Sequence, residues 1–557
     1  MSVSIIKRVL LILLFISLFS CVNSKPDIII FESPHIIQNK IQDIDLNGWH
    51  HMDVINDTIP GISLDKAYNK ILNNKTGDTV IVAVIDTEVD LEHEDLVGSF
   101  WVNKKEIPDN NIDDDSNGYI DDIHGWNFLG NDKGENIIYA NYEFIRIIRK
   151  YDSLFKNKTE VDIDESLKKE FQLYQKSLEL KKEKEKSLIA SLNRGKTIYQ
   201  NHILATNFFK DIYGTEQIEL DSIKKYNPKD SLTEKYKKDM LFSLNRGLTN
   251  KTLEIYIDQQ KGLMEKSLNA DYIDRVITGD NFNDIKDIKY GNNQVSKNLK
   301  ELYHGTLVSG VLSGNRSNDI GIRGISDNII IMPLAVSANG DELDKDIALA
   351  IRYAVDNGAD VINMSSGKQY SLNKEWVEEA LLYAAKKNVL FVTSAGNNNE
   401  NLDLEENNYY PNDTYIEDSI VKKSFLMIGA SSYDLNHKFT YSNTNYGKIN
   451  VDIFAPGSRI YTTRPLNDYS FSNGTSMATP IVSGIAALIK SYYPHFSAAE
   501  IKDILLRSGT SYHLDVKIYE EDDTTKMIPF SELSKTGKVV NAYNALLMAK
   551  ELSKSKK

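Results

Sequence analysis

Residues 79–86, with the sequence TVIVAVID, form the stretch from which the fold is predicted. The run is continuously apolar, rich in β-branched residues and ends in an acid, which is typical of a parallel strand buried on both faces. Similar runs follow at 328–336, 360–365, 388–397, 424–430 and 451–457. Between some of them, residues 343–356 and 374–387 place apolar side chains at three- and four-residue spacing, which indicates helices. This alternation predicts an α/β fold, a doubly wound and mostly parallel sheet flanked by helices, with functional groups at the carboxyl ends of its strands.

Residues 136–294 differ in composition from the rest of the chain. They are rich in Lys, Glu, Leu and Tyr, poor in Gly, and include the charge-dense run LELKKEKEKSLIASLNRG at 178–195. Such a pattern indicates amphipathic helices with solvated charged faces. The predicted parts of the chain are a signal peptide at 1–20, a leader at 21–75, an α/β domain made of 76–135 and 295–549, and an all-α insertion at 136–294.

The composition limits the classes of partner. The chain has 557 residues, of which 79 are Asp or Glu and 65 are Lys or Arg, so its formal net charge is −14. This excess of acid argues against nucleic acid as a main partner and against electrostatic docking on anionic lipid. The sequence contains one cysteine, so we expect no disulfide in the mature chain and a stability that depends on packing and on bound ions.

The N-terminus carries an export pattern. Lys7 and Arg8 precede an apolar run at 9–19, which is shorter than the roughly 20 residues that a membrane-spanning helix needs. Residues 18–21, LFSC, resemble a bacterial lipoprotein box, in which Cys21 would become the lipidated N-terminus. We therefore expect an exported protein that is anchored to the cell envelope by its N-terminal lipid. The alternative is a plain signal peptide with an incidental cysteine.

Three polar residues stand at the ends of predicted elements. Asp86 closes the first strand, His304 opens HGTLVSG, and Ser476 lies in NGTSMATP at the start of a helical pattern. A serine becomes nucleophilic when a base takes its proton, and an imidazole base needs a carboxylate that orients it and stabilises its cation. Taken alone, Ser476 would be interpreted as a helix N-cap. Together, the three residues predict a catalytic serine.

The motifs DTEVDLEHEDL at 86–96, HGTLVSG at 304–310 and NGTSMATPIVSG at 473–484 resemble those of the subtilisin-like serine peptidases, in the same order. This resemblance implies a serine endopeptidase in which Asp86, His304 and Ser476 form the triad. It also implies an acyl-enzyme, a polypeptide substrate, no cofactor for catalysis and a monomeric protein.

The resemblance extends to residues that would hold the substrate. Asn397 in VTSAGN corresponds to the second donor to the oxyanion, although three consecutive asparagines are also typical of a turn. The substrate would bind as an added strand along Ser365, Ser366 and Gly367. The pocket for the residue before the cut would be walled by Ser394, Ala395 and Gly396.

Two positions depart from the family pattern. Glu88 stands where the Asp motif usually has glycine, and Leu307 stands where a second histidine is usual. Glu88 would either strain the turn after Asp86 or raise the pKa of His304 as a second carboxylate. An inactive peptidase scaffold that acts as a surface binding protein is therefore an alternative function, and a serine hydrolase of another ester or amide class is a third.

Residues 113–122, DDDSNGYIDD, have the oxygen-ligand spacing of calcium loops. We expect a structural calcium ion here, with the ligand set Asp113, Asp115, Asn117, Tyr119, Asp121 and Asp122. His124 occupies the position of the usual twelfth-residue acid, so a solvated acidic turn is the alternative.

The insertion lies between the Asp and His motifs, so it must leave and return near the cleft. A lid, an exosite and an inhibitory plug are all compatible with this position. Residues 22–75 are too few for a full folding propeptide, and their last part, GISLDKAYNKIL at 61–72, resembles the N-terminal helix of the mature enzymes.

Overall fold

The computed structural model describes residues 46–73, 75–414, 416–519 and 524–556. The predicted signal peptide and Cys21 lie outside these residues, as does roughly the first half of the leader. Within the described ranges, no helix combines the length and the apolar character needed to cross a bilayer.

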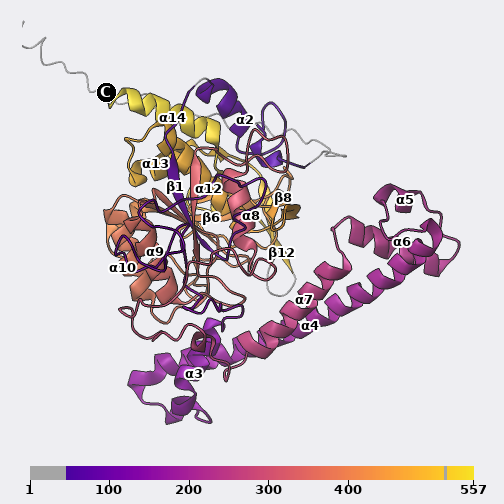
Figure 1. Ribbon diagram of the computed structural model, residues 1–557, viewed down its shortest axis with the longest axis horizontal. Coiled ribbons are helices and arrows are strands. Elements are labelled where there is room, and N and C mark those ends of the chain that lie inside the picture. Colours follow the sequence, from indigo (N-terminus) through magenta and orange to yellow (C-terminus); the bar gives the residue numbers. More distant parts are fainter. Residues whose placement is uncertain (1–45, 74, 415, 520–523, 557) are drawn as a thin grey trace, which may run out of the picture.

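The core of the protein is a nine-stranded sheet with the order β10-β13-β7-β6-β5-β4-β1-β3-β2 (Figure 1). Its strands are β1 (Val80–Asp86), β2 (Trp126–Asn127), β3 (Ile329–Ala335), β4 (Val361–Met364), β5 (Leu390–Ser394), β6 (Phe425–Ser431), β7 (Ile453–Pro456), β10 (Thr510–Ser511) and β13 (Lys538–Val539). All neighbouring pairs are parallel except β10 with β13. The chain winds outward from β1 in both directions, which confirms the predicted doubly wound α/β fold.

Strand β1 lies deep in the sheet because both of its faces are apolar. Val80, Val82 and Val84 enter one core, and Ala83 and Ile85 enter the other. The first core is covered by α2 (Leu64–Ala67), α8 (His304–Ser313), α12 (Thr475–Tyr492), α13 (Ala498–Ser508) and α14 (Ala542–Lys554), and the second by α9 (Asp344–Asp356) and α10 (Lys374–Lys386). Each fully buried valine of β1 contributes on the order of 2 kcal/mol by leaving water.

The remaining elements are small. They are two antiparallel hairpins, β8 (Ile460–Arg464) with β9 (Asp468–Ser472) and β11 (Asp515–Tyr519) with β12 (Thr525–Pro529), and the helix α11 (Ser419–Ser424). Short helical turns occur at Trp49–His51, Tyr68–Leu72, Glu160–Asp162, Glu165–Leu167, Leu263–Ser267, Asp274–Val276 and Phe530–Glu532.

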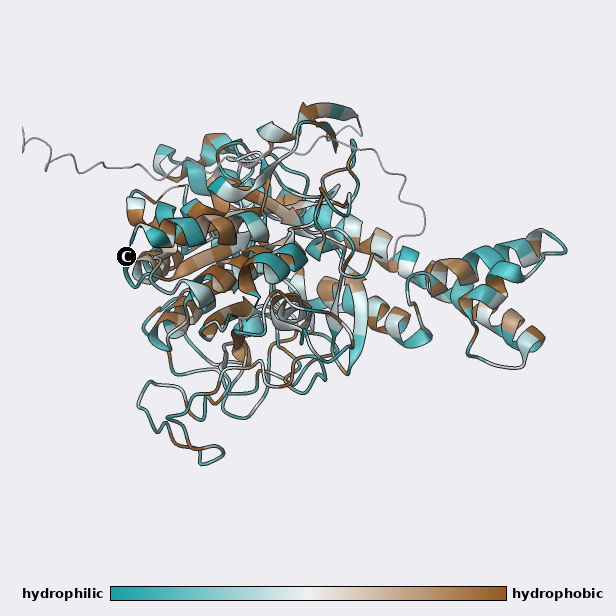
Figure 2. Ribbon diagram, turned by 90° about the horizontal axis from the view of Figure 1, so that it is seen from above, coloured by the Kyte–Doolittle hydropathy of each residue, from teal (hydrophilic) through white to brown (hydrophobic). Residues whose placement is uncertain are grey.

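Between β2 and α8 the chain forms five helices: α3 (Glu143–Phe155), α4 (Lys168–Tyr213), α5 (Leu220–Lys225), α6 (Ser231–Leu244) and α7 (Asn250–Gly262). Helices α4 to α7, which we call the arm, extend away from the rest of the protein, which we call the body (Figure 1). Helix α4 contains no proline that would interrupt it. Its Gly195 has no side chain, so the Tyr256 ring of α7 packs directly on the α4 backbone. Figure 2 shows hydrophobic and hydrophilic residues alternating along the arm, as expected for paired amphipathic helices.

Candidate active site

Asp86 and His304 meet where β1 ends and α8 begins. His304 Nδ1 lies 2.8 Å from Asp86 Oδ1 and 3.0 Å from Oδ2. The backbone N–H of Thr87 also donates to Asp86 Oδ1, at 2.7 Å. The Asp86 side chain is 1% exposed, whereas that of His304 is 32% exposed. The carboxylate is therefore fixed inside the body, and the imidazole that it orients reaches the surface.

The surroundings of His304 raise its pKa above the ordinary value. Burial disfavours the charged ring and acts in the opposite direction, but the charge and the hydrogen bond of Asp86 outweigh it, and the charge of Glu342 adds to them. Glu342 is buried and accepts a hydrogen bond from Ser337 Oγ at 2.8 Å. No pattern in the sequence points to Glu342, because its position beside His304 depends on the fold.

Ser476 is the second residue of α12, and the N-cap is Gly474 with φ 136°. The interpretation of Ser476 as a helix cap is therefore wrong. Its side chain lies in the first turn, where unpaired backbone N–H groups and the helix dipole favour negative charge. Helices α8 and α12 pack on each other in the same core, which brings their N-terminal ends to the same edge of the sheet. Among the described residues, no hydrogen bond joins Ser476 Oγ to the His304 ring.

Asn397 follows β5 and is anchored on the start of α12. Its Oδ1 accepts hydrogen bonds from Thr475 N at 2.9 Å and from Thr475 Oγ1 at 3.2 Å. A Cβ atom placed on Gly474 would lie 3.3 Å from both Asn397 Nδ2 and Ser476 Oγ, so these two atoms face the same small space. The amide donor has no partner among the described side chains and backbone groups and is exposed to solvent, which leaves it available to an oxyanion.

The residues predicted to hold the substrate lie at two neighbouring strand ends. Ser365, Ser366 and Gly367 follow β4, Ser394 is the last residue of β5, and Ala395 and Gly396 follow it. The Tyr409 ring stands between the two segments. A Cβ atom would lie 2.6 Å from this ring if placed on Gly367 and 2.7 Å from it if placed on Gly396. The sequence gives no signal for Tyr409, which narrows the space between the two predicted walls.

The segment after β3, at 338–340, and the segment after β4 are each paired on one side by the chain itself. Asn339 N donates to Ile138 O at 3.0 Å, and Ala140 N donates to Asn339 O at 3.0 Å. Lys368 and Tyr410 exchange backbone hydrogen bonds of 3.0 and 2.7 Å. The start of the predicted insertion therefore adds a strand-like segment beside residues 338–340.

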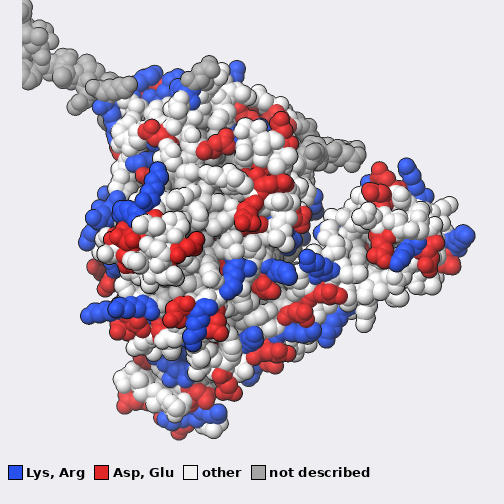
Figure 3. Space-filling model, in the orientation of Figure 1, with Lys and Arg blue, Asp and Glu red and all other residues white. Residues whose placement is uncertain are grey.

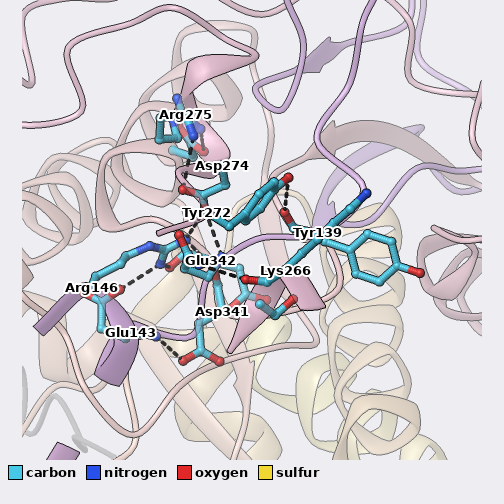
Figure 4. A network of polar contacts seen from close by, with 12 residues as sticks. Tyr139, Glu143, Arg146, Lys266, Tyr272, Asp274, Arg275, Asp341 and Glu342 are labelled. Atoms are coloured by element: carbon cyan, nitrogen blue, oxygen red, sulfur yellow. Dashed lines mark hydrogen bonds and ion pairs between the residues drawn. The ribbon is translucent and has the colours of Figure 1, made fainter. Parts of the chain in front are cut away.

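A buried ionic network joins α3 to the same region (Figure 4). Arg146 donates to Glu143 at 2.8 Å and to Asp274 at 2.9 Å, and also to the carbonyl oxygens of Asp341 at 3.0 Å and Glu342 at 3.2 Å. Burial lowers the pKa of Arg146, but the two carboxylates raise it further, so the guanidinium stays charged. This one side chain fixes the backbone at 341–342.

Lys368 extends the network from the segment after β3 to the segment after β4. These segments contribute Asp341 and Gly367 to the lining of a cavity that we call the groove. Its buried ammonium lies 2.9 Å from Asp344 Oδ1 and 3.3 Å from Glu143 Oε2, and it donates to Glu342 O at 2.8 Å. Glu143 therefore contacts both Arg146 and Lys368. The segment after β3 and the segment after β4 are held at a fixed separation by residues of α3.

Glu88 is buried and is satisfied by hydrogen bonds, so it does not have either effect that we predicted for it. Its backbone is not in the left-handed region, and the groups that raise the pKa of His304 are Asp86 and Glu342. Its carboxylate accepts hydrogen bonds from the backbone N–H groups of Lys297 and Asn298 and from the side-chain amides of Asn127, Asn136 and Asn298. Glu88 thus joins the two ends of the 136–294 segment at its base.

The acidic loop brings together only part of the predicted ligand set. Carboxylate oxygens of Glu106, Asp113 and Asp115 all lie within 4.8 Å of one another. Glu106 was missed because it precedes the DDDSNG motif, and an acid seven residues upstream of such a motif is a weak signal.

The other predicted ligands have different partners. Asp121 accepts from the backbone of Asn110 and Asn111, at 3.3 and 2.8 Å. Asp122 accepts from Asn103 at 2.8 Å, Asn117 at 3.0 Å and Tyr353 at 2.5 Å, and the Tyr119 ring packs edge-on against Trp126 and Tyr353. Of the six predicted ligands, Asp113 and Asp115 therefore share a cluster of carboxylates, which Glu106 joins.

Known proteins resemble this chain over the same elements. A family model described as the subtilase family matches residues 77–525. The chain is 37% identical over 190 residues to the thermophilic serine proteinase of Bacillus sp. (strain AK1), which covers 34% of this chain and 42% of that protein. It is 31% identical over 209 residues to subtilisin DY of Bacillus licheniformis, covering 37% of this chain and 70% of the relative.

Other matches are more partial. The cell wall-associated protease of Bacillus subtilis (strain 168) is 32% identical over 225 residues, covering 39% of this chain and 23% of the relative. The chain spans 50% of the length of alkaline elastase YaB from Bacillus sp. (strain YaB), so it covers half or less of several of these proteins. A solved protease of Pseudoalteromonas arctica PAMC 21717 has a TM-score of 0.35 at 27% identity, covering 44% of this chain and 70% of that one.

The family match includes every element of the site described above. Asp86, His304, Asn397 and Ser476 all lie within residues 77–525. Because this match covers most of the chain, the protein belongs to the subtilase family.

Proposed function

We propose that this protein is a serine endopeptidase that hydrolyses peptide bonds through an acyl-enzyme. The observation that carries the proposal is the 2.8 Å contact between Asp86 and His304 at the end of β1, beside the helix terminus that bears Ser476. Membership of the subtilase family supports it.

In this mechanism, His304 Nε2 accepts the proton of Ser476 Oγ as the oxygen attacks the carbonyl carbon, and Asp86 stabilises the imidazolium. The backbone N–H of Ser476 and the Asn397 amide then donate to the oxyanion. His304 returns the proton to the leaving amine, and water releases the acyl group by the same steps. A serine and a histidine that are not yet hydrogen-bonded are compatible with this, since such bonds often tighten only when substrate binds.

The groove favours an extended polypeptide. Successive residues of a strand direct their N–H and C=O groups to opposite sides, so the pairing of Asn339 and Lys368 on the outer side leaves Ala338, Gly340 and Gly367 to face the groove. The Tyr409 ring shortens the pocket between Gly367 and Gly396. We therefore propose that small side chains are preferred immediately before the cut.

A fluorophosphonate probe combined with a peptide library tests the proposal. An active peptidase is labelled at Ser476 and cleaves casein and peptides. An inactive scaffold gives no labelling, whereas a serine hydrolase of another class is labelled and leaves every peptide intact.

Replacing Glu342 by Gln is expected to move the acidic limb of the pH profile of kcat/KM to lower pH. His304 acts as a base only when it is neutral, and the nearby carboxylates of Asp86 and Glu342 raise its pKa against the effect of burial. Removing one negative charge lowers that pKa, so the enzyme retains activity at lower pH. Profiles of wild type and variant check this, with the exposed Glu92→Gln as a control that leaves the limb in place.

We also propose a structural calcium ion at Glu106, Asp113 and Asp115, where three carboxylates converge and hard oxygen ligands suit calcium. Calcium at 100 times its Kd is expected to stabilise the fold by about 2.7 kcal/mol, seen as a rise in melting temperature. Asp113→Asn should remove most of this rise, and the exposed Asp132→Asn should keep it. A solvated turn would show equal melting temperatures with calcium and with chelator.

We propose further that the mature protein is exported, monomeric and anchored by a lipid on Cys21. The apolar run and the LFSC sequence support the anchor. An alkyne-labelled fatty acid is expected to be incorporated into wild type and not into Cys21→Ser, which should appear in the soluble fraction. Equal labelling of both proteins would contradict the assignment.

A further inference from the structure

A cavity of about 470 Å³ lies where the arm meets the body. Its walls come from α4, from the turn between α6 and α7, from α7, and from the segment just before α8. Tyr303, which precedes His304, lines it, as does Arg464 at the end of β8. We call it the junction cavity; its lining residue Tyr303 is next in sequence to the proposed catalytic histidine, and none of the predicted substrate-binding residues lines it.

Four cationic side chains line the junction cavity: Arg194, Arg246, Lys300 and Arg464. Within the described part of the chain, none of them is in an ion pair with a carboxylate. Of the two acids in the wall, Asp258 is already paired with Lys261 at 2.9 Å, and Glu301 stands alone. The cavity is therefore cationic in a protein whose net charge is −14.

Aromatic rings of the wall contact two of these cations. Arg246 lies 3.9 Å from the centre of the Phe242 ring, and Arg464 lies 4.9 Å from the centre of the Tyr303 ring. Stacking on a ring restricts a guanidinium and leaves its N–H groups free to bind an anion. Figure 3 shows Lys and Arg side chains along the junction between arm and body, with acidic side chains beside them on the arm and both kinds of charge over the rest of this face.

Cations from four separate elements repel one another unless an anion is present. The cavity volume is within the usual range of ligand sites, and its remaining walls include apolar and aromatic side chains such as Ile198, Leu248 and Tyr256. Such a site suits carboxylates that are interspersed with apolar side chains. A long nucleic acid suits it poorly, because the net charge of −14 on the whole chain would repel a polyanion.

We infer that the junction cavity is an exosite that binds an acidic segment of polypeptide substrates, at a distance from the cleaved bond. Tyr303 connects the cavity to His304, so one polypeptide chain can occupy both the exosite and the groove. The inference rests on the proposed peptidase function and adds a preference for substrate class to it. Engagement of the exosite is expected to lower KM, because its carboxylate contacts form before the chemical step.

Two fluorogenic peptides with one cleavage sequence provide the test. One carries a tail of alternating Glu and Leu, and the other carries a tail of Ser and Gly. For wild type, kcat/KM should be about tenfold higher for the acidic peptide. The difference should arise from a lower KM and should disappear at high salt. In Arg194→Glu/Arg246→Glu the ratio should fall to about one. The matched control Lys225→Glu/Lys229→Glu reverses two exposed charges elsewhere on the arm and should keep the wild-type ratio.

Binding of the acidic peptide to Ser476→Ala, measured by fluorescence anisotropy, separates this inference from the proposed catalysis. Tight, salt-sensitive binding that is lost with Arg194→Glu/Arg246→Glu supports the exosite even if no peptide is cleaved. Equal binding of both peptides overturns it, as does equal loss in the control variant. Competition by an oligonucleotide as strong as that by the acidic peptide also overturns it, because the site would then recognise any polyanion.

Discussion

Ser476→Ala is expected to lower kcat by about 10⁴- to 10⁶-fold and to abolish labelling by a fluorophosphonate, a range set by removal of triad residues in subtilisin. The variant removes the only oxygen of this side chain, while the N-terminus of α12 and the Asp86–His304 contact do not depend on it. Substrate binding should therefore persist, and KM should change far less than kcat. Steady-state kinetics measure kcat and KM, and intact-protein mass spectrometry measures labelling by the fluorophosphonate.

Asn397→Ala serves as the graded control for this loss. It removes one donor to the oxyanion and leaves the nucleophile in place, so kcat should fall by about 10²- to 10³-fold while labelling is slowed but still occurs at Ser476. Undiminished turnover in Ser476→Ala would disprove the proposed mechanism. Equal effects of the two substitutions would show that Asn397 supports the fold of the site and not only the oxyanion.

Arg146→Ala is expected to lower the free energy of unfolding by about 3–5 kcal/mol, because it leaves the buried carboxylate of Asp274 without its ion-pair partner and that of Glu143 with Lys368 alone. The loss is large compared with the 5–15 kcal/mol stability of a typical domain. It should also raise KM for long peptides, since Arg146 holds the backbone of Asp341 and Glu342 beside the groove. Urea unfolding and kinetics on peptides of increasing length measure these two effects.

Arg352→Ala is the control for Arg146→Ala. Arg352 is partly exposed and lies 4.0 Å from Glu379, which is itself largely exposed, so its removal should cost less than about 1 kcal/mol. Arg146→Lys, which keeps the charge but not the forked donors, should give an intermediate loss. Similar unfolding free energies for the Arg146→Ala and Arg352→Ala proteins would mean that the buried network contributes little to stability.

The sequence predicted the central elements because their signals are local. The apolar run at 79–86 specifies β1 through its own composition, and helices α9 and α10 begin and end within one residue of the predicted ranges. The Asp86–His304 contact was also expected, because both residues stand at element ends that a doubly wound sheet brings to one edge. The two hairpins were not predicted, since β8, β9 and β12 lack a regular alternation of buried and exposed residues, and β11, which has it, is only five residues long.

The sequence could not show features that depend on partners far along the chain. Tyr409 reaches the space between Gly367 and Gly396 from a loop after β5, and Glu106 joins Asp113 and Asp115 outside the motif. Glu88 illustrates the same limit, because its hydrogen-bond donors near residue 297 lie about two hundred positions away. From the sequence alone, the charge of Glu88 suggested a strained turn after Asp86 or a raised pKa of His304, because the sequence does not show these donors.

Glu88 also determines which deletions between β1 and α8 the fold would tolerate. A truncated protein that keeps Glu88 but lacks residues 128–303 would lose Asn136, Lys297 and Asn298, and would bury a carboxylate with too few donors. Excision of the arm alone leaves all of these donors in place and requires no change at Glu88, whereas the larger deletion requires one.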